Sequence, residues 1–239
     1  MAKVLIACET SGTVRDAFLA LGHDAWSCDI LPSDRPSNRH IQDDVRNVMS
    51  GDWDLMAVMH PPCTRLCNSG VRWLKVAPTN APDAATDFEK ARWSEMSEDM
   101  KISIMWRLLD EGASLFSDCW NADHIPCIAI ENPVMHRHAK ARIKNFQNFT
   151  QSVQPWQFGT DPDGPDNEKK RTCLWTRNLP KLTATGTLDG STARDSVHKA
   201  PPGADRWKIR SKFFPGIAAA MADQWGSYAE AQYKARAAA

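Results

Sequence analysis

The feature of the sequence that most constrains the fold is a short apolar segment that runs into two prolines. Residues Asp54–Met59 read Asp-Leu-Met-Ala-Val-Met, and His60, Pro61, Pro62 and Cys63 follow directly. An apolar run of this length is typical of a buried strand. Because proline has no N–H to give to a sheet ladder, the strand must end there. Cys63 is therefore predicted at the carboxyl edge of a sheet, where open α/β sheets bind ligands.

The same arrangement recurs later in the chain. The apolar run Ile125–Ile130 is followed by Glu131, Asn132 and Pro133, so a second buried strand ends at a polar residue and a proline. We expect Cys63 and Glu131 at the same sheet edge. A carboxyl group buried there has a raised pKa and can donate or share a proton. The alternative for Cys63 is a small apolar core residue, since free cysteines often pack in this way.

The start of the chain predicts a nucleotide-type βαβ unit. A strand at Lys3–Ala7 is followed by a small-residue turn, a helix at Thr13–Leu21 and a strand at Ala25–Cys28 that finishes at Asp29. N–H groups of the turn and of the helix N-terminus can hold a carboxylate or phosphate, and Asp29 can accept from ribose hydroxyls. With Gly12 as the turn's one glycine, a purely structural turn is the alternative.

Periodicity and chain breakers predict the remaining elements. A third strand is expected at His40–Val45, where Asp43 or Asp44 can accept from an adenine amino group. A polar loop is predicted at Val71–Pro82, and one or two helices from an Asp83 N-cap to Cys119, with an apolar stripe that includes Phe88 and Met100. Strands are predicted at Gln154–Phe158 and Thr172–Trp175. The remaining predictions are an irregular stretch at Lys181–Asp205, a helix at Phe214–Tyr228 and a frayed tail after Ala229.

Composition narrows the class of protein. A chain of 239 residues suffices for one sizeable α/β domain. The formal net charge is zero, so a polyanionic partner must meet local basic patches such as His136–Lys144 or Lys169–Arg171. The seven cysteines form no regular framework, there is no signal peptide, and no apolar run approaches the roughly 20 residues of a membrane span. We expect a soluble protein in a reducing cytoplasm, bacterial or phage-infected.

Taken in order, these motifs resemble the DNA (cytosine-5) methyltransferases, especially small phage-type members without a separate target-recognition domain. Pro61-Pro62-Cys63 matches the nucleophile motif of that family, and Glu131-Asn132 matches its glutamate–asparagine motif. The supporting matches are Cys8–Gly12 to the glycine-rich cofactor turn, Asp29 to the ribose contact, Asp44-Val45 to the adenine contact, Lys169 and Arg171 to a basic pair at the target base, and Phe214–Trp225 to the last motif.

The resemblance implies a class I S-adenosylmethionine-dependent methyltransferase fold, which is a Rossmann-like, mostly parallel seven-stranded sheet with helices on both faces. It implies one catalytic domain over residues 1–239, with a reduced, irregular region at 160–212 in place of a recognition domain. The activity implied is methyl transfer from S-adenosylmethionine to C5 of cytosine in flipped-out duplex or single-stranded DNA.

The resemblance also assigns residues to this activity. Cys63 would attack C6 of the base, Glu131 would act at N3, and Lys169 and Arg171 would hold the base and its backbone. The cofactor-binding set is Cys8, Glu9, Thr10, Ser11, Gly12, Asp29, Ile30, Asp44, Val45 and Pro61. The substrate-binding set is Pro62, Asn68, Ser69, Asn132 and Pro133, and Asn68–Lys75 would form a loop that closes over the base.

Departures from the family pattern leave alternatives open. Glu9 and Ser11 replace glycines, His60 replaces a glycine, Thr64 replaces a glutamine, and Pro215-Gly216 replaces a glycine–asparagine pair. The same chemistry on RNA or free cytosine nucleotides, a different transferred group, and a catalytically silent binding protein are the alternatives. A metal site from His60, Cys63 and Cys67 has no obvious fourth ligand, so we expect no metal.

Overall fold

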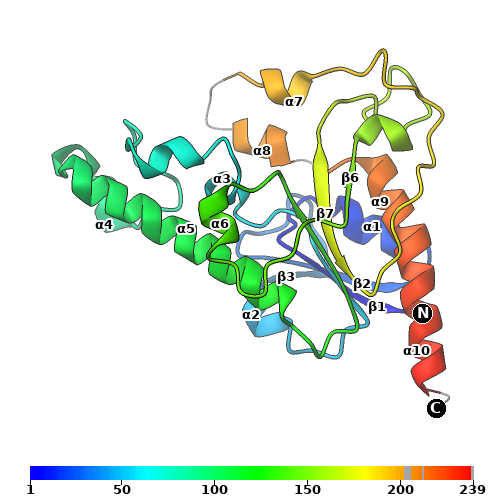
Figure 1. Cartoon of the computed structure of the whole chain (residues 1–239). Coiled ribbons are helices and arrows are strands. Elements are labelled where there is room, and N and C mark those ends of the chain that lie inside the picture. Colours follow the sequence, from blue (N-terminus) through cyan, green and yellow to red (C-terminus); the bar gives the residue numbers. More distant parts are fainter. Residues whose placement is uncertain (202–205, 212, 238–239) are drawn as a thin grey trace. The chain divides into compact units, whose positions relative to one another are not determined.

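The computed structural model describes residues 1–201, 206–211 and 213–237. The contacts divide the chain into two compact units. Figure 1 labels the helices and strands along the chain. The sheet unit comprises Met1–His60, Ala122–Glu131 and Asn148–Ala239, and the helical unit comprises Pro61–Asn121 and Asn132–Gln147. One catalytic domain over residues 1–239 stays a prediction.

A seven-stranded sheet forms the core of the sheet unit, in the order β3-β2-β1-β4-β5-β7-β6. Parallel pairs join β1 to β2, β1 to β4, β2 to β3 and β4 to β5, whereas β6 and β7 are antiparallel. The bounds are β1 Lys3–Ala7, β2 Asp24–Asp29, β3 His40–Gln42, β4 Leu55–Val58, β5 Cys127–Asn132, β6 Gln151–Val153 and β7 Thr172–Arg177. The predicted α/β class and mostly parallel seven-stranded sheet are confirmed.

The strand order reverses at β1, and this reversal marks the expected ligand edge. Strands β2 and β3 lie on one side of β1, and β4 and β5 lie on the other. Ala7, at the end of β1, pairs with Cys28 of β2 and with Val58 of β4. Open α/β sheets bind ligands at the carboxyl ends of strands beside such a reversal. The residues that follow β1, β2, β4 and β5 lie at this edge, since these strands are parallel.

One face of this sheet packs against α1 (Thr13–Ala20) and the C-terminal helices. The latter are α9 (Pro215–Met221), the π-helix η4 (Ala222–Gly226) and α10 (Ser227–Ala237), which follow one another at the red end of the chain in Figure 1. Alternate residues of β1, β4 and β5 enter this core, since strand side chains alternate between faces. Trp225 is fully buried there and donates its Nε1–H to the Pro180 carbonyl at 2.9 Å.

The helical unit is built on α5 (Glu98–Trp120), whose apolar stripe contacts α3 (Cys63–Leu66) and α6 (Arg137–Lys140). The buried stripe includes Met105, Leu108, Leu109 and Phe116. A Cβ on Gly112 would lie 3.5 Å from both Leu66 and the Pro62 carbonyl, so this glycine allows α3 to approach closely. The unit's other elements are η1 (Val71–Leu74), α4 (Asp87–Arg92) and η2 (Trp93–Glu95).

Two predicted strands are wrong in part. Gln154–Phe158 is no strand, because Pro155 opens a 3₁₀ helix, η3 (Pro155–Phe158), and Gln157 accepts a hydrogen bond from the Gln154 N–H at 2.7 Å. The strand predicted at His40–Val45 stops at Gln42. Asp44 instead caps α2 (Val45–Val48) by accepting from the Arg46 N–H.

The predicted helix start at Asp83 is also wrong. Thr86 caps α4 with a capping box to Glu89, and Ser97 caps α5, so the stretch holds two α-helices, one of the two predicted outcomes. Phe88 and Met100 are exposed rather than part of the apolar stripe.

Three looser predictions need correction as well. The predicted polar loop at Val71–Pro82 contains η1, whose Leu74 is buried. The predicted frayed tail is helical through Ala237. The predicted irregular stretch Lys181–Asp205 contains the short helix α7 (Ser196–Lys199), and its residues 202–205 lie outside the described part. The helix α8 (Arg206–Ser211) follows it, and the reduced region at 160–212 stays a prediction. None of the helices in the described ranges combines the length and apolar character that a membrane span requires.

Candidate active site

The turn after β1 is organised by the carboxylate of Glu9. Glu9 is fully buried, and its oxygens accept from the N–H groups of Val14 at 2.7 Å and Arg15 at 3.2 Å. The Ser11 hydroxyl donates to the same carboxylate and accepts from the Thr13 N–H. Burial raises the pKa of Glu9, and the backbone donors oppose that shift. Among the N–H groups predicted to hold a ligand's anion, those of Thr13, Val14 and Arg15 therefore already have acceptors within the chain.

A buried guanidinium closes the same turn. Arg15 is 3% exposed, donates to the Ser27 hydroxyl at 2.9 Å and pairs with Asp16 at 2.8 Å. Gly12 has a φ of 70°, and a Cβ there would meet an Arg15 guanidinium nitrogen at 2.2 Å. The glycine is thus needed for both its conformation and its lack of a side chain.

The segment after β2 is hydrogen-bonded onto this turn. The Thr10 carbonyl accepts from the Asp34 N–H at 2.9 Å and from the Ser33 hydroxyl at 3.2 Å. Arg35 donates to the Ser11 carbonyl at 3.2 Å and pairs with Asp16 at 2.7 Å. The β1–α1 turn and the loop after β2 therefore form one connected edge.

Asp29 and Ile30 present a carboxylate and an exposed apolar side chain at the end of β2. One Asp29 oxygen accepts from the Leu31 N–H at 2.9 Å. Burial raises the pKa of Asp29, whereas hydrogen bonding to Leu31 and the charge of His40 lower it. Ile30 is 70% exposed, an unusual position for an isoleucine. Asp44 engages its neighbour Arg46 at 3.2 Å, and Val45 is buried.

Glu131 lies at the end of β5 as a buried carboxyl group. It is 5% exposed. Burial raises its pKa to about 7, and the charge of Lys170 lowers it. The pKa of the Cys173 thiol on β7 is raised to about 11, mainly by burial and in smaller part by the charge of Glu131, whereas Arg171 lowers it. A carboxyl group with this pKa can hold a proton or release it at neutral pH.

His60 lies beyond the end of β4, the strand paired with β5. Its Nε2 is buried without a hydrogen-bond partner among the described residues, and its ring meets the Phe213 ring edge-on, with centroids 5.8 Å apart. Burial, and then the charge of Lys170, lower the pKa of His60 to about 3, so the imidazole is neutral. We call His60, Glu131, Lys170, Phe213 and Phe214 the carboxyl-edge cluster; Lys170 lies 5.7 Å from the Phe214 ring.

Within the basic triplet before β7, Lys170 is the residue whose charge acts on Glu131. Lys169 is exposed, and its N–H binds the Arg194 carbonyl at 2.6 Å. Arg171 is exposed and lies 5.7 Å from the Phe149 ring. The family resemblance predicts roles for Lys169 and Arg171 and none for Lys170, whose charge acts on Glu131. The two-residue alternation of extended chain, which separates Lys170 from both neighbours, was the available signal.

In the helical unit, Cys63 is the first residue of α3. It is half-buried, and its carbonyl accepts from the Cys67 N–H at 2.9 Å. Pro61 is buried, whereas Pro62, Asn68 and Ser69 are exposed.

Asn132 and Pro133 belong to the same unit. Asn132 is fully buried, donates to the Pro133 carbonyl at 2.8 Å and leaves its Oδ1 without a partner among the described residues. His136 pins α6 onto α3: its ring bonds the Arg65 carbonyl at 2.8 Å and accepts from the Ala139 N–H at 3.1 Å. This part of the basic stretch is structural.

The predicted site residues therefore divide between the units. The sheet unit holds the predicted cofactor edge from Cys8 to Val45, together with Glu131, Lys169 and Arg171. The helical unit holds Pro61, Pro62, Cys63, Asn68, Ser69, Asn132 and Pro133. Across the described ranges, no three His, Cys, Asp or Glu side chains gather as metal ligands.

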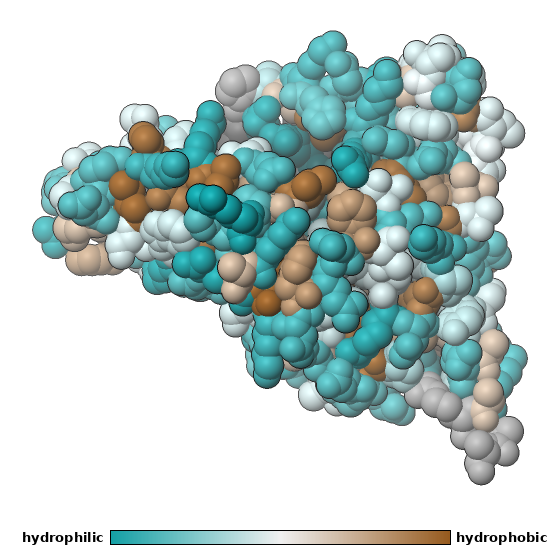
Figure 2. Space-filling view, viewed as in Figure 1, coloured by the Kyte–Doolittle hydropathy of each residue, from teal (hydrophilic) through white to brown (hydrophobic). Residues whose placement is uncertain are grey.

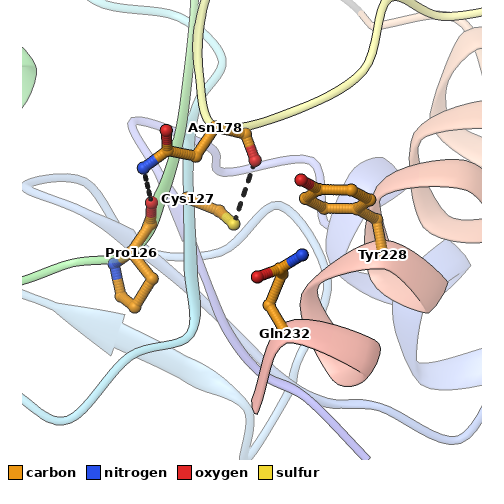
Figure 3. A pocket seen from close by; sticks show the side chains of 5 residues that line it. All are labelled: Pro126, Cys127, Asn178, Tyr228 and Gln232. Atoms are coloured by element: carbon orange, nitrogen blue, oxygen red, sulfur yellow. Dashed lines mark hydrogen bonds between the residues drawn. The ribbon is translucent and has the colours of Figure 1, made fainter. Parts of the chain in front are cut away.

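A pocket of about 350 Å³ lies at the opposite edge of the sheet (Figure 3). It is lined by Pro126, Cys127, Asn178, Tyr228 and Gln232. Cys127 is the first residue of β5, whereas Glu131 is near its end, and the Cys127 thiol donates to the Asn178 carbonyl at 3.4 Å. This pocket is therefore separate from the carboxyl-edge cluster.

No protein-family model matches the sequence, and no curated protein matches it. The fold defines a mixed α/β protein whose mostly parallel sheet is compatible with a Rossmann-like fold.

Proposed function

We propose that this protein is a DNA (cytosine-5) methyltransferase of the class I, S-adenosylmethionine-dependent fold. The observation that carries the proposal is the buried Glu131 carboxyl, with a pKa of about 7, at the end of the strand that pairs with β4. Five residues after β4 the chain reaches Cys63, which begins α3. The resemblance of Pro61-Pro62-Cys63 and Glu131-Asn132 to the family's two central motifs supports the same function.

The proposed chemistry needs a nucleophile and a proton donor. C5 of cytosine is a poor nucleophile, and addition of the Cys63 thiolate to C6 makes an enamine whose C5 can take a methyl group. Glu131 protonates N3 as the ring gains electron density, and so stabilises the adduct. S-adenosylmethionine, when bound, would supply the methyl group to C5 and leave as S-adenosylhomocysteine. Loss of the C5 proton to water, return of the N3 proton to Glu131 and expulsion of the Cys63 thiolate would then restore the aromatic ring.

The cofactor edge fits part of S-adenosylmethionine well. Asp29 offers a carboxylate to ribose hydroxyls, and the exposed Ile30 offers an apolar surface to adenine. Glu9 occupies the N–H groups of Val14 and Arg15, so the cofactor's own carboxylate must be held elsewhere. The departures at Glu9 and His60 keep a different transferred group as the second candidate.

The substrate proposed is a cytosine outside the helix stack. Extrusion of a base from duplex DNA costs a few kcal/mol and is least costly where the strand is already single. RNA and free cytosine nucleotides present the same ring to Cys63 and Glu131, and they are the competing substrates.

The test is incorporation of label from methyl-labelled S-adenosylmethionine into duplex DNA, single-stranded DNA, RNA or dCMP. We expect transfer to DNA, and loss of transfer in Cys63→Ser with cofactor binding retained in calorimetry. Cys67→Ser is the matched control, since Cys67 is a nearby buried thiol that the mechanism does not use. Normal turnover by Cys63→Ser would refute the nucleophile assignment, and exclusive labelling of dCMP or RNA would replace the substrate.

A further inference from the structure

A basic and aromatic surface of the helical unit lies outside the proposed chemistry. We define the α6 surface as Trp106 of α5 together with Arg137, His138, Lys140, Arg142 and Lys144. The segment His136–Lys144 contains four Lys or Arg residues and no acidic residue. Figure 2 shows strongly hydrophilic residues gathered where Figure 1 places α6 and the adjoining part of α5.

Three of these cations have no carboxylate as an ion-pair partner among the described residues. Arg137, Lys140 and Lys144 are exposed, and the described residues place no carboxylate in ion-pair contact with them. Arg142, by contrast, is oriented by Asp110 of α5. Exposed cations clustered within eight residues suit a partner with closely spaced negative charges, such as a phosphate backbone.

Flat side chains that contact one another accompany the charge. The Arg142 guanidinium lies 4.6 Å from the Trp106 ring, and the His138 ring meets Trp106 edge-on with centroids 5.1 Å apart. Trp106 and His138 are both partly exposed. Aromatic and guanidinium planes are the groups on which unpaired bases stack.

The apolar residues of this segment argue against a membrane as the partner. Ala139 and Ile143 are buried, so α6 offers no apolar face for insertion into lipid. We therefore propose that the α6 surface binds single-stranded nucleic acid, with Arg137, Lys140 and Lys144 on phosphates and Trp106 stacked on a base. The inference deepens the proposed function by naming where substrate docks, yet it depends only on contacts inside the helical unit.

The experiment measures binding of a fluorescently labelled single-stranded DNA 20-mer to the full chain in the Cys63→Ser background without cofactor, at several salt concentrations. In the triple variant R137A/K140A/K144A, we expect the slope of log affinity against log salt to fall by about 2, at about 0.7 per lost phosphate contact. The triple variant K90A/K199A/K234A removes the same charge from exposed sites elsewhere and is expected to leave the slope unchanged.

Trp106 supplies an independent readout. Trp106→Ala is expected to weaken binding by about 5- to 150-fold, and Trp106→Phe to retain most of the affinity because it keeps a stacking plane. Circular dichroism checks that each variant is folded. Equal slopes for the two triple variants, or binding to phosphatidylserine vesicles in place of DNA, would overturn the proposal. If the wild-type chain shows no methyl transfer while this binding pattern is observed, the proposed reaction alone is refuted.

Discussion

The state of Glu131 can be tested through stability, without any substrate. The pKa of its carboxyl rises from an ordinary 4.5 to about 7 because the group is buried. The neutral form is therefore favoured in the folded protein. The stability linked to Glu131 is complete below pH 4.5 and is lost as the pH rises through 7.

The magnitude follows from the size of the shift. A rise from 4.5 to about 7 corresponds to about 3.4 kcal/mol at full ionisation, at about 1.36 kcal/mol per pKa unit. About 2.5 kcal/mol of this loss falls between pH 5 and pH 8. Glutamine has the same shape and does not titrate, so Glu131→Gln escapes the loss. The difference in the free energy of unfolding between Glu131→Gln and wild type is therefore expected to shift by about 2.5 kcal/mol in favour of the variant between pH 5 and pH 8.

Guanidinium unfolding followed by circular dichroism at pH 5 and pH 8 measures this difference. Glu95→Gln removes an exposed carboxylate and is the matched control, with no pH-dependent difference expected. Lys170→Met removes the charge that lowers the pKa of Glu131, and so moves the loss of stability to higher pH. A difference between wild type and Glu131→Gln that stays constant from pH 5 to pH 8 would refute the buried, proton-holding carboxyl.

Two further predictions concern the turn after β1. Glu9→Ala leaves the Val14 and Arg15 N–H groups without their acceptor and is expected to cost about 1–3 kcal/mol in urea unfolding; a variant as stable as wild type would contradict the capping role. An alanine in the left-handed conformation of Gly12 costs roughly 1–2 kcal/mol. Gly12→Ala is expected to lower the free energy of unfolding by more than this, because the added Cβ also meets Arg15. Gly22→Ala is the control: Gly22 has a φ of 81° and open space around it, so this variant should lose only the conformational term of roughly 1–2 kcal/mol in the same assay.

The strands near the ligand edge could be predicted because short apolar runs and chain breakers act locally. The runs at Lys3–Ala7, Asp54–Met59 and Ile125–Ile130 all form central strands. Buried parallel strands leave this signal whatever surrounds them. Glu131 was likewise placed at a strand end, with the raised pKa that burial there implies.

The predicted element boundaries are wrong where a helix begins at a capping side chain or at a proline, because the spacing of apolar residues does not mark such starts. Asp83 resembles a helix N-cap in sequence, but the capping box of Thr86 and Glu89 sets the start of α4. Pro155 sits at the first position of a 3₁₀ helix, within a stretch whose composition resembles a strand. The role of Lys170 depends on which side chain of a basic triplet lies near Glu131, and tertiary packing decides that.

The capped turn after β1 has a dynamic consequence. Because Glu9 holds the Val14 and Arg15 amides in the free protein, this edge of the sheet is already ordered when a ligand arrives. Hydrogen exchange at those two amides should then be slow in the apo state and little changed by saturation. The turn is thus preorganised, and a ligand that binds at this edge would lose little entropy by ordering it.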